Sequence, residues 1–293
     1  MIYTNAGSAR IDRAVSVPRS GTSFPRGQAH SESRQLLDLT KSLAWRDVRV
    51  RYRQSLLGIG WAVAQPISLM LVFTLVFGGT TAGGGVPEGV PYPLYALCGL
   101  VPWTFFAGAL NGCVNSLVAN RNLVTKVYFR REALPLSCVV ASLVDFAIAS
   151  CVLFGLMTYF HVTGRWHFAP TVGLFLLPAV LLIHLMLTVG LGLLLAMMNL
   201  FYRDVRQVHA IAIQLLMFLS GIVLPLPRDG SFASQVLALN PLVPVVDAYR
   251  DCLIHARTPE VMELQYAAVI SGAILVGGWT AFRRASWRFA ECI

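Results

Sequence analysis

The sequence contains little charge of either sign and almost no lysine. Only 13% of its 293 residues are charged, whereas 56% are hydrophobic, and soluble domains carry about 25% charged residues. Of the 23 basic residues, only Lys41 and Lys126 are lysines. A composition this poor in charge excludes an ordinary water-soluble domain. The net charge of +9 does not indicate nucleic acid either, because the basic residues cluster beside apolar spans, as membrane orientation requires.

Motifs for catalysis and metal binding are also missing. The sequence has no Gly-x-x-x-x-Gly-Lys-Ser/Thr loop, no Gly-x-Ser-x-Gly and no His-Glu-x-x-His. Its six cysteines form no Cys-x-x-Cys pair and its six histidines are scattered, so no metal site is indicated. Glu260 and Glu263 fit the acidic first turn of a helix better than a catalytic pair. We expect no catalytic, cofactor-binding or metal-binding residue here, and any ATP must be hydrolysed by another chain.

Long apolar runs are what the sequence has in place of charge. About 20 apolar residues are needed to cross a bilayer as a helix. Six stretches meet or approach this length: 58–79, 92–118, 134–160, 171–200, 208–226 and 266–282. The sequence therefore predicts an all-α integral membrane protein with six transmembrane helices per subunit.

The orientation in the membrane follows from the basic residues between the spans. One side carries 19 of them and the other side carries four. Basic residues accumulate on the cytoplasmic side, so both termini are predicted to be cytoplasmic. We expect residues 1–33 to form a disordered cytoplasmic tail, because they contain no apolar run, and residues 283–293 to form a second tail. The membrane domain itself is predicted to cover residues 58–282.

Three segments are neither spans nor plain loops. The pattern of residues 34–57 predicts an amphipathic helix that lies in the plane of the membrane interface. Its arginine stripe either anchors the helix to anionic headgroups or receives an anionic lipid substrate or a protein partner. Loop 119–133 mixes basic and aromatic residues, which suits either a protein partner or the headgroups. The external segment 227–265 contains two short apolar pieces that predict a re-entrant helix pair or an external cap.

Asp145 is the only carboxylate inside the predicted spans. Counting from Leu134 at 1.5 Å per residue places it near mid-bilayer, where an ionised acid is costly. A protonated or hydrogen-bonded structural role is expected, but Asp145 also supports a rival function, a proton-coupled secondary transporter. A second rival is a polyprenyl-lipid glycosyltransferase or polymerase, for which no acid or base stands out at a membrane-edge loop.

Four segments resemble the polysaccharide-exporting ABC permeases, the family of O-antigen, capsule and teichoic-acid exporters. They are residues 46–58 (RDVRVRYRQSLLG) with Trp61 and Pro66, residues 122–129 (NLVTKVYF) with Arg131-Glu132 and Pro135, residues 199–205 (NLFYRDV), and Asn240-Pro241 with Tyr249-Arg250. They occur in the order and at the topological positions that the family uses. Arg130 departs from the pattern, since many members have proline there.

The resemblance implies a homodimer joined to two P-loop ATPase subunits, which would bind the ATP and magnesium. It implies a sugar polymer carried on an undecaprenyl diphosphate-type lipid as substrate, and the bacterial inner membrane as location. The residues expected to contact the ATPase are Arg46, Asp47, Arg49, Asn122, Leu123, Lys126, Val127, Tyr128, Phe129, Arg131, Glu132, Arg203 and Asp204. The expected external gate contains Asn240, Pro241, Tyr249 and Arg250.

Two further groups are candidates for contact with the substrate. Arg49, Arg51 and Arg53 are the candidates for binding lipid headgroups or a pyrophosphate. Aromatic residues near span ends either stack on sugars along a channel or form the interfacial belt, and the belt is favoured: Trp61, Phe73, Phe77, Trp103, Phe105 and Phe106. Together these features predict the channel subunit of an ATP-driven exporter without catalysis of its own.

Overall fold

A computed structural model describes residues 28–53, 58, 60–78, 89–126, 129–222, 237 and 239–289 of the chain. Within these residues the structure is helical and has no strand, so the all-α prediction is confirmed for them. The helices are α1 (Gln28–Arg53), α2 (Gly60–Phe77), α3 (Tyr92–Ala119), α4 (Arg121–Lys126), α5 (Ala133–Val162), α6 (Leu177–Phe201), α7 (Val205–Leu219), α9 (Leu242–Leu253) and α10 (Val261–Ala285), with short 3-10 turns η1 (Val172–Leu176) and η2 (Ser286–Arg288).

Five of these segments are long and apolar enough to cross a membrane: Gly60–Phe77, Tyr92–Ala119, Ala133–Val162, Val172–Phe201 and Val261–Arg288. They coincide with five of the six predicted spans. The remaining prediction, 208–226, corresponds to α7, which has only 15 residues. At 1.5 Å per residue α7 is about 22 Å long, less than the hydrocarbon thickness of about 30 Å. The count of six spans therefore stays a prediction.

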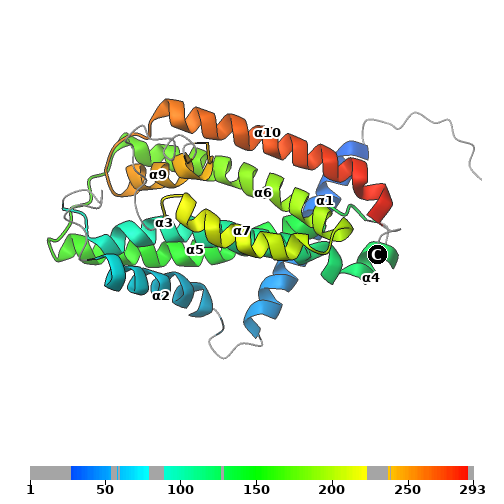
Figure 1. Cartoon of the computed structure of the whole chain (residues 1–293), viewed down its shortest axis with the longest axis horizontal. Coiled ribbons are helices and arrows are strands. Elements are labelled where there is room, and N and C mark those ends of the chain that lie inside the picture. Colours follow the sequence, from blue (N-terminus) through cyan, green and yellow to red (C-terminus); the bar gives the residue numbers. More distant parts are fainter. Residues whose placement is uncertain are drawn as a thin grey trace, which may run out of the picture.

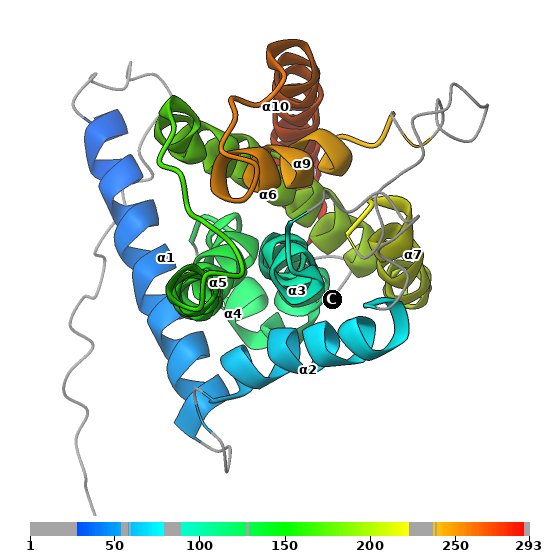
Figure 2. The same ribbon diagram turned by 90° about the vertical axis from the view of Figure 1, so that its left-hand side faces the viewer.

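The long helices lie side by side around α3 (Figures 1 and 2). α3 packs against α5, α6, α2 and α9, and most of its residues are buried. α2, α3 and α5 are apolar around their whole circumference, as expected of helices that face either protein or lipid. The central core consequently lies where α3, α5, α6 and α9 meet.

The α6–α10 contact depends on two glycines. A Cβ atom added to Gly278 would lie 2.4 Å from the carbonyl oxygen of Gly190. Such a distance is far below van der Waals contact, so only glycine allows the two backbones to approach this closely. Small residues play the same part in other membrane helix pairs.

α1 runs crosswise to the central helices of the bundle. In Figure 2, which looks along the bundle, α1 runs crosswise to α3 and α5, and it packs against α5. It begins at Gln28, six residues before the start predicted from the sequence, and its described part ends at Arg53. Of the tail predicted for residues 1–33, residues 1–27 lie outside the described chain, as do residues 290–293 of the second predicted tail, and residues 28–33 belong to α1. A crosswise amphipathic helix is the arrangement expected at a membrane surface.

Candidate functional site

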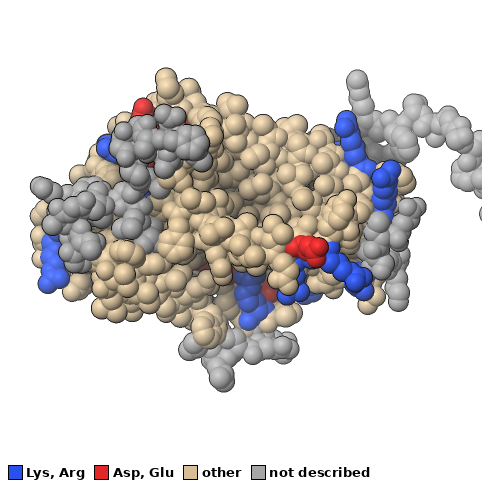
Figure 3. Space-filling model, in the orientation of Figure 1, with Lys and Arg blue, Asp and Glu red and all other residues tan. Residues whose placement is uncertain are grey.

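Charged side chains gather toward one end of the bundle. In Figure 3 most of the visible face is uncharged, and basic atoms collect at the end that holds the last turns of α10, with smaller groups below the middle and at the opposite end. The uncharged zone is the part suited to hydrocarbon. The crowded end contains most of the residues that were expected to contact an ATPase.

The arginines of α1 are held by different neighbours. Arg46 donates to the carboxylate of Asp47 at 2.9 Å through Nη2 and to Oδ1 of Asn120 at 3.2 Å. Arg49 lies over the ring of Trp45, with its guanidinium carbon 5.7 Å from the ring centroid. Both guanidinium groups remain exposed, so they can still meet a partner or a headgroup. The side chain of Arg53 is outside what the structure describes.

Arg51, a predicted headgroup or pyrophosphate ligand, is instead paired within the chain. Arg51 and Tyr52 both donate to the carboxylate of Asp145 on α5. Burial raises the pKa of Tyr52, and its hydrogen bond to Asp145 raises it further. The expectation that Asp145 is hydrogen-bonded is therefore confirmed.

α5 is longer than the span predicted from the sequence. α5 has 30 residues and is about 45 Å long, which exceeds the hydrocarbon thickness of about 30 Å. The earlier count assumed that the span begins at Leu134. Asp145 contacts the end of α1 through Arg51 and Tyr52, and its depth in a membrane stays a prediction.

The loop predicted to couple with an ATPase turns partly inward. Arg131 donates to the backbone carbonyl of Ser286 and its guanidinium carbon lies 5.8 Å from the ring centroid of Phe289. Glu132 is buried and accepts an ion pair from Arg283, with Nε 3.5 Å from Oε1. These two residues therefore fasten the loop to the last turns of the chain, and their contact with an ATPase stays a prediction.

Other residues of the same loop have mixed exposure. Asn122 is exposed and Leu123 is half-buried. Phe129 is half-buried against a second hydrophobic core, which includes Leu43 of α1 and Phe282 of α10. Val127 and Tyr128 lie outside the described residues, as does the side chain of Lys126. Arg203 and Asp204, in the turn between α6 and α7, are both exposed.

The candidate channel aromatics are mostly core residues. The exposed fraction is 1% for Phe105, 0% for Phe106, 6% for Trp103 and 9% for Phe73. Phe77 is half-buried, and Trp61 is 57% exposed. In this structure the four buried rings cannot stack on a passing sugar, which corrects the channel hypothesis for them, and Trp61 is the one of the six with a largely free face.

The expected external gate is built around α9. Asn240 begins it, since its Oδ1 accepts a hydrogen bond from the Leu242 amide at 3.0 Å, and Pro241 follows with a helical φ of −66°. Tyr249 is buried beside His184 of α6, with ring centroids 6.1 Å apart. The first of the two predicted short pieces, 232–239, lies almost entirely outside the described residues.

Arg250 is the most completely buried charged residue of this region, at 1% exposure. It donates to the carbonyls of Gly221 at 2.9 Å and Ile222 at 2.7 Å, and its guanidinium carbon lies 4.0 Å from the ring centroid of Tyr95. An ion pair to Asp247 at 3.3 Å supplies the counter-charge. A buried guanidinium needs such partners to offset its desolvation.

A second polar cluster closes the end of α9, and sequence reasoning missed it. Asp251 accepts hydrogen bonds from His255 at 2.9 Å and from Arg257 at 2.7 Å. Burial alone would raise the pKa of Asp251, but these two hydrogen bonds and the charge of Arg257 lower it below its ordinary value. The i, i+4 spacing of Asp251 and His255 was the available signal.

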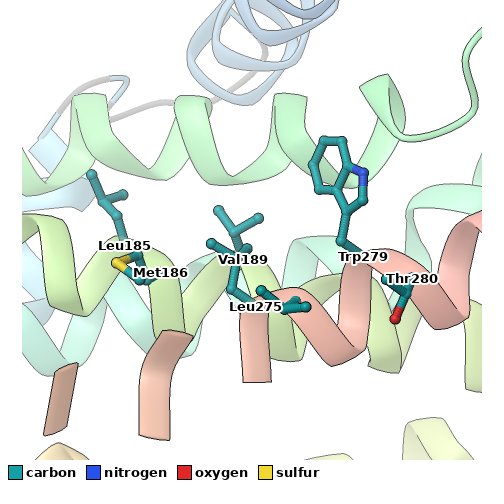
Figure 4. A pocket seen from close by; sticks show the side chains of 7 residues that line it. Leu185, Met186, Val189, Leu275, Trp279 and Thr280 are labelled. Atoms are coloured by element: carbon teal, nitrogen blue, oxygen red, sulfur yellow. The ribbon is translucent and has the colours of Figure 1, made fainter. Parts of the chain in front are cut away.

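An apolar hollow of about 480 Å³ lies between α6 and α10. Figure 4 shows its lining, which consists of Leu185, Met186, Val189, Leu275, Val276, Trp279 and Thr280. Nearly all of this lining is hydrocarbon. It lacks the convergent polar groups with which proteins bind sugars, so it is not a candidate for the path of a polysaccharide.

Long apolar helices, joined by a crosswise helix α1 and with polar clusters toward both ends of the bundle, are typical of a multi-pass membrane protein. The sequence profile of the ABC-2 type transporter family matches residues 38–254. The chain belongs to this family.

Curated relatives narrow the comparison. The chain is 32% identical to the O-antigen export system permease protein RfbA of Myxococcus xanthus over an alignment of 262 residues, which covers 88% of this chain and 96% of that protein. It is 25% identical to an O-antigen export system permease protein RfbA of Klebsiella pneumoniae, with the same coverage of both chains. To the polysialic acid transport protein KpsM of Escherichia coli it is 26% identical, covering 83% of this chain and 92% of that one. These relatives are transport permeases and not enzymes, as predicted for this chain.

Proposed function

We propose that this chain is the membrane subunit of an ABC exporter that moves a lipid-linked polysaccharide from the cytoplasm across the bacterial inner membrane. The observation that carries the proposal is the similarity to O-antigen export permeases over almost the whole of both chains. The likeness to a polysialic acid transporter supports a polysaccharide as the shared substrate class. The carrier that suits a bacterial inner membrane is an undecaprenyl diphosphate-type lipid.

The energy source in this proposal is a separate pair of P-loop ATPase subunits that bind ATP and magnesium. The sequence itself contains no P-loop. The exposed residues that support a docking surface come from three places at the crowded end of the bundle: Arg46 and Arg49 on α1, Asn122 on α4, and Arg203 with Asp204 before α7. In this arrangement both termini are cytoplasmic.

Two copies of the chain are proposed to form the conduit. α7 presents a stripe at i, i+3, i+7 and i+10 whose side chains are about 60% exposed: Val208, Ile211, Leu215 and Phe218. α2 is also largely exposed, and the two helices flank α3 in Figure 2. A pair related by a two-fold axis would cover these faces and place a pathway between the copies.

The experiment that tests the function combines purification with export. The chain is co-expressed with candidate P-loop ATPases, and surface polysaccharide is measured in cells that lack the native gene. We expect a stable complex, export that stops on ATP depletion, and export that persists when the proton gradient is collapsed at constant ATP. Saturable ATP hydrolysis by the isolated chain, or export that follows the proton gradient, would contradict the proposal.

The homodimer has its own test. In a background without native cysteines, Ile211→Cys on α7 is treated with a short bis-maleimide in membranes. We expect cross-linked pairs of the chain. Val269→Cys on α10, which is 70% exposed, is the matched control and should remain monomeric. Equal cross-linking at the two positions would remove the assignment of α7 to the interface.

A further inference from the structure

The C-terminal end of α7 poses a hydrogen-bonding problem. The helix ends at Leu219, and the backbone turns away at Gly221 with a φ of 64°. Gly221 and Ile222 follow the helix, so their backbone carbonyls have no place in its hydrogen-bond ladder. Ser220, Gly221 and Ile222 are all buried, so solvent does not satisfy these groups. Buried carbonyls of this kind need donors from elsewhere in the protein.

α9 supplies those donors. Arg250 reaches the carbonyl oxygens of Gly221 and Ile222 with its two terminal nitrogens, at 2.9 and 2.7 Å. Asn240 donates from Nδ2 to Oγ of Ser220 at 2.8 Å. A cation at this position also suits the negative end of the α7 dipole. Asn240, just before α9, and Arg250, in its last turn, thus fasten α9 to the end of α7.

The guanidinium of Arg250 fits beside α3 only because residue 99 is a glycine. A Cβ atom added to Gly99 on α3 would lie 2.6 Å from Nη2 of Arg250 and 3.1 Å from the carbonyl oxygen of Ile222. The ring of Tyr95 covers the other side of the group. α3 is therefore shaped to seat the Arg250 side chain against the end of α7.

Along its length, α7 is held far more loosely. His209 is the only buried residue between Val205 and Leu219, where its Nε2 lies 2.9 Å from Oδ1 of Asn111. The other end of α7 follows the exposed pair Arg203 and Asp204 directly. α7 is thus a short, weakly packed helix with a partner-facing turn at its start and a tight connection to α9 at its end.

We propose that Arg250 is a positioning residue that makes α7 and α9 move together, so that a displacement of the Arg203–Asp204 turn reaches the external side. The proposal rests on the proposed function, because the displacement would come from the ATPase. Rigid elements that share a buried polar contact can transmit such a shift over the length of a helix. α7 supplies about 22 Å of this distance.

The test uses the exporter complex with Arg250→Met, which keeps the length of the side chain and removes its donors. Arg257→Met is the matched control, since Arg257 also belongs to this external segment but is 60% exposed at its side chain and pairs with Asp251. Membrane level, ATPase co-purification, ATP hydrolysis and polysaccharide export are measured together. The decisive quantity is export per ATP hydrolysed.

With Arg250→Met we expect ATP hydrolysis within about twofold of the original and export per ATP reduced at least about tenfold, or about 1.4 kcal/mol of coupling. Arg250→Lys should recover part of the loss, and Gly99→Ala should reproduce it by crowding Nη2. If Arg250→Met does not accumulate, the milder Gly99→Ala decides. A purely structural role would lower protein level and leave export per ATP unchanged, which would overturn the inference.

Failure of the proposed function is recognised separately. In that case the unmodified chain itself would show no ATP-dependent export. An equal loss of export per ATP in Arg257→Met would overturn the role of Arg250 while leaving the exporter intact.

Discussion

Asp145→Asn should destabilise the protein without abolishing export. The substitution keeps the shape of the side chain but removes the negative charge that Arg51 and Tyr52 share. The ion pair is partly exposed, with side-chain exposures of 43% and 25%, so its loss costs at most about 1 kcal/mol. The hydrogen bond from Tyr52 loses a charged acceptor, which adds about 1 kcal/mol.

The sum of about 1–2 kcal/mol corresponds to a fall in Tm of about 3–6 °C. The measurement is thermal unfolding of the purified protein in nanodiscs, together with polysaccharide export at matched membrane levels. Asp38→Asn is the control, because Asp38 is an exposed carboxylate on α1, the helix that carries Arg51 and Tyr52. It should leave Tm unchanged. The exchange of charges, Arg51→Asp with Asp145→Arg, should restore part of the lost stability.

One result would refute this reasoning. If Asp145→Asn left Tm unchanged and stopped export, Asp145 would act as a proton carrier and not as a tie between α1 and α5. Export in the original protein would then also follow the proton gradient.

Three other substitutions probe the packing at separate places. Gly278→Ala should cost about 1–3 kcal/mol of stability by overpacking against Gly190, seen as a lower Tm, whereas a neutral result would mean that α6 and α10 are not in close contact. Glu132→Gln should weaken the tie to Arg283 and make the end of α10 more sensitive to limited proteolysis, and unchanged cleavage would show that the pair contributes nothing. Asp251 has a lowered pKa in the folded protein. The stability that its ionised form contributes is therefore complete above about pH 3.9, the pKa of an unfolded Asp, and is lost as the pH falls further. Asp251→Asn should lower Tm at pH 7 and flatten the decline of Tm in acid, and an unaltered acid profile would contradict the assignment.

The sequence predicts the spans well because hydrocarbon sets their length and composition. Apolar runs alone do not say whether a side chain faces lipid, a channel or the interior, and this is why Phe105 and Phe106 were candidates for a channel and turned out to be core. The end of α7 could not be placed either, because residues 222–226 (IVLPL) continue the apolar run after the helix stops at Leu219.

In the candidate site, too, the sequence predicts local segments but not the contacts between them. Local signals identified α1, the loop before α5 and the segment that contains α9. Long-range contacts could not be read from spacing: Arg51 with Asp145 are 94 residues apart, and Arg131 with Ser286 are 155 apart. For this reason the sequence alone does not show that Arg51 and Arg131 have partners within the chain.

Phe289 has a consequence for how the protein is made. Its side chain is fully buried in the same core as Leu43 of α1 and Val124 of α4. These residues leave the ribosome long before residue 289, and α10 must first be inserted into the membrane. Until then their apolar faces stay uncovered, so this end of the bundle closes only after translation has passed the last span. A nascent chain interrupted before that point would present an open hydrophobic surface to chaperones and proteases.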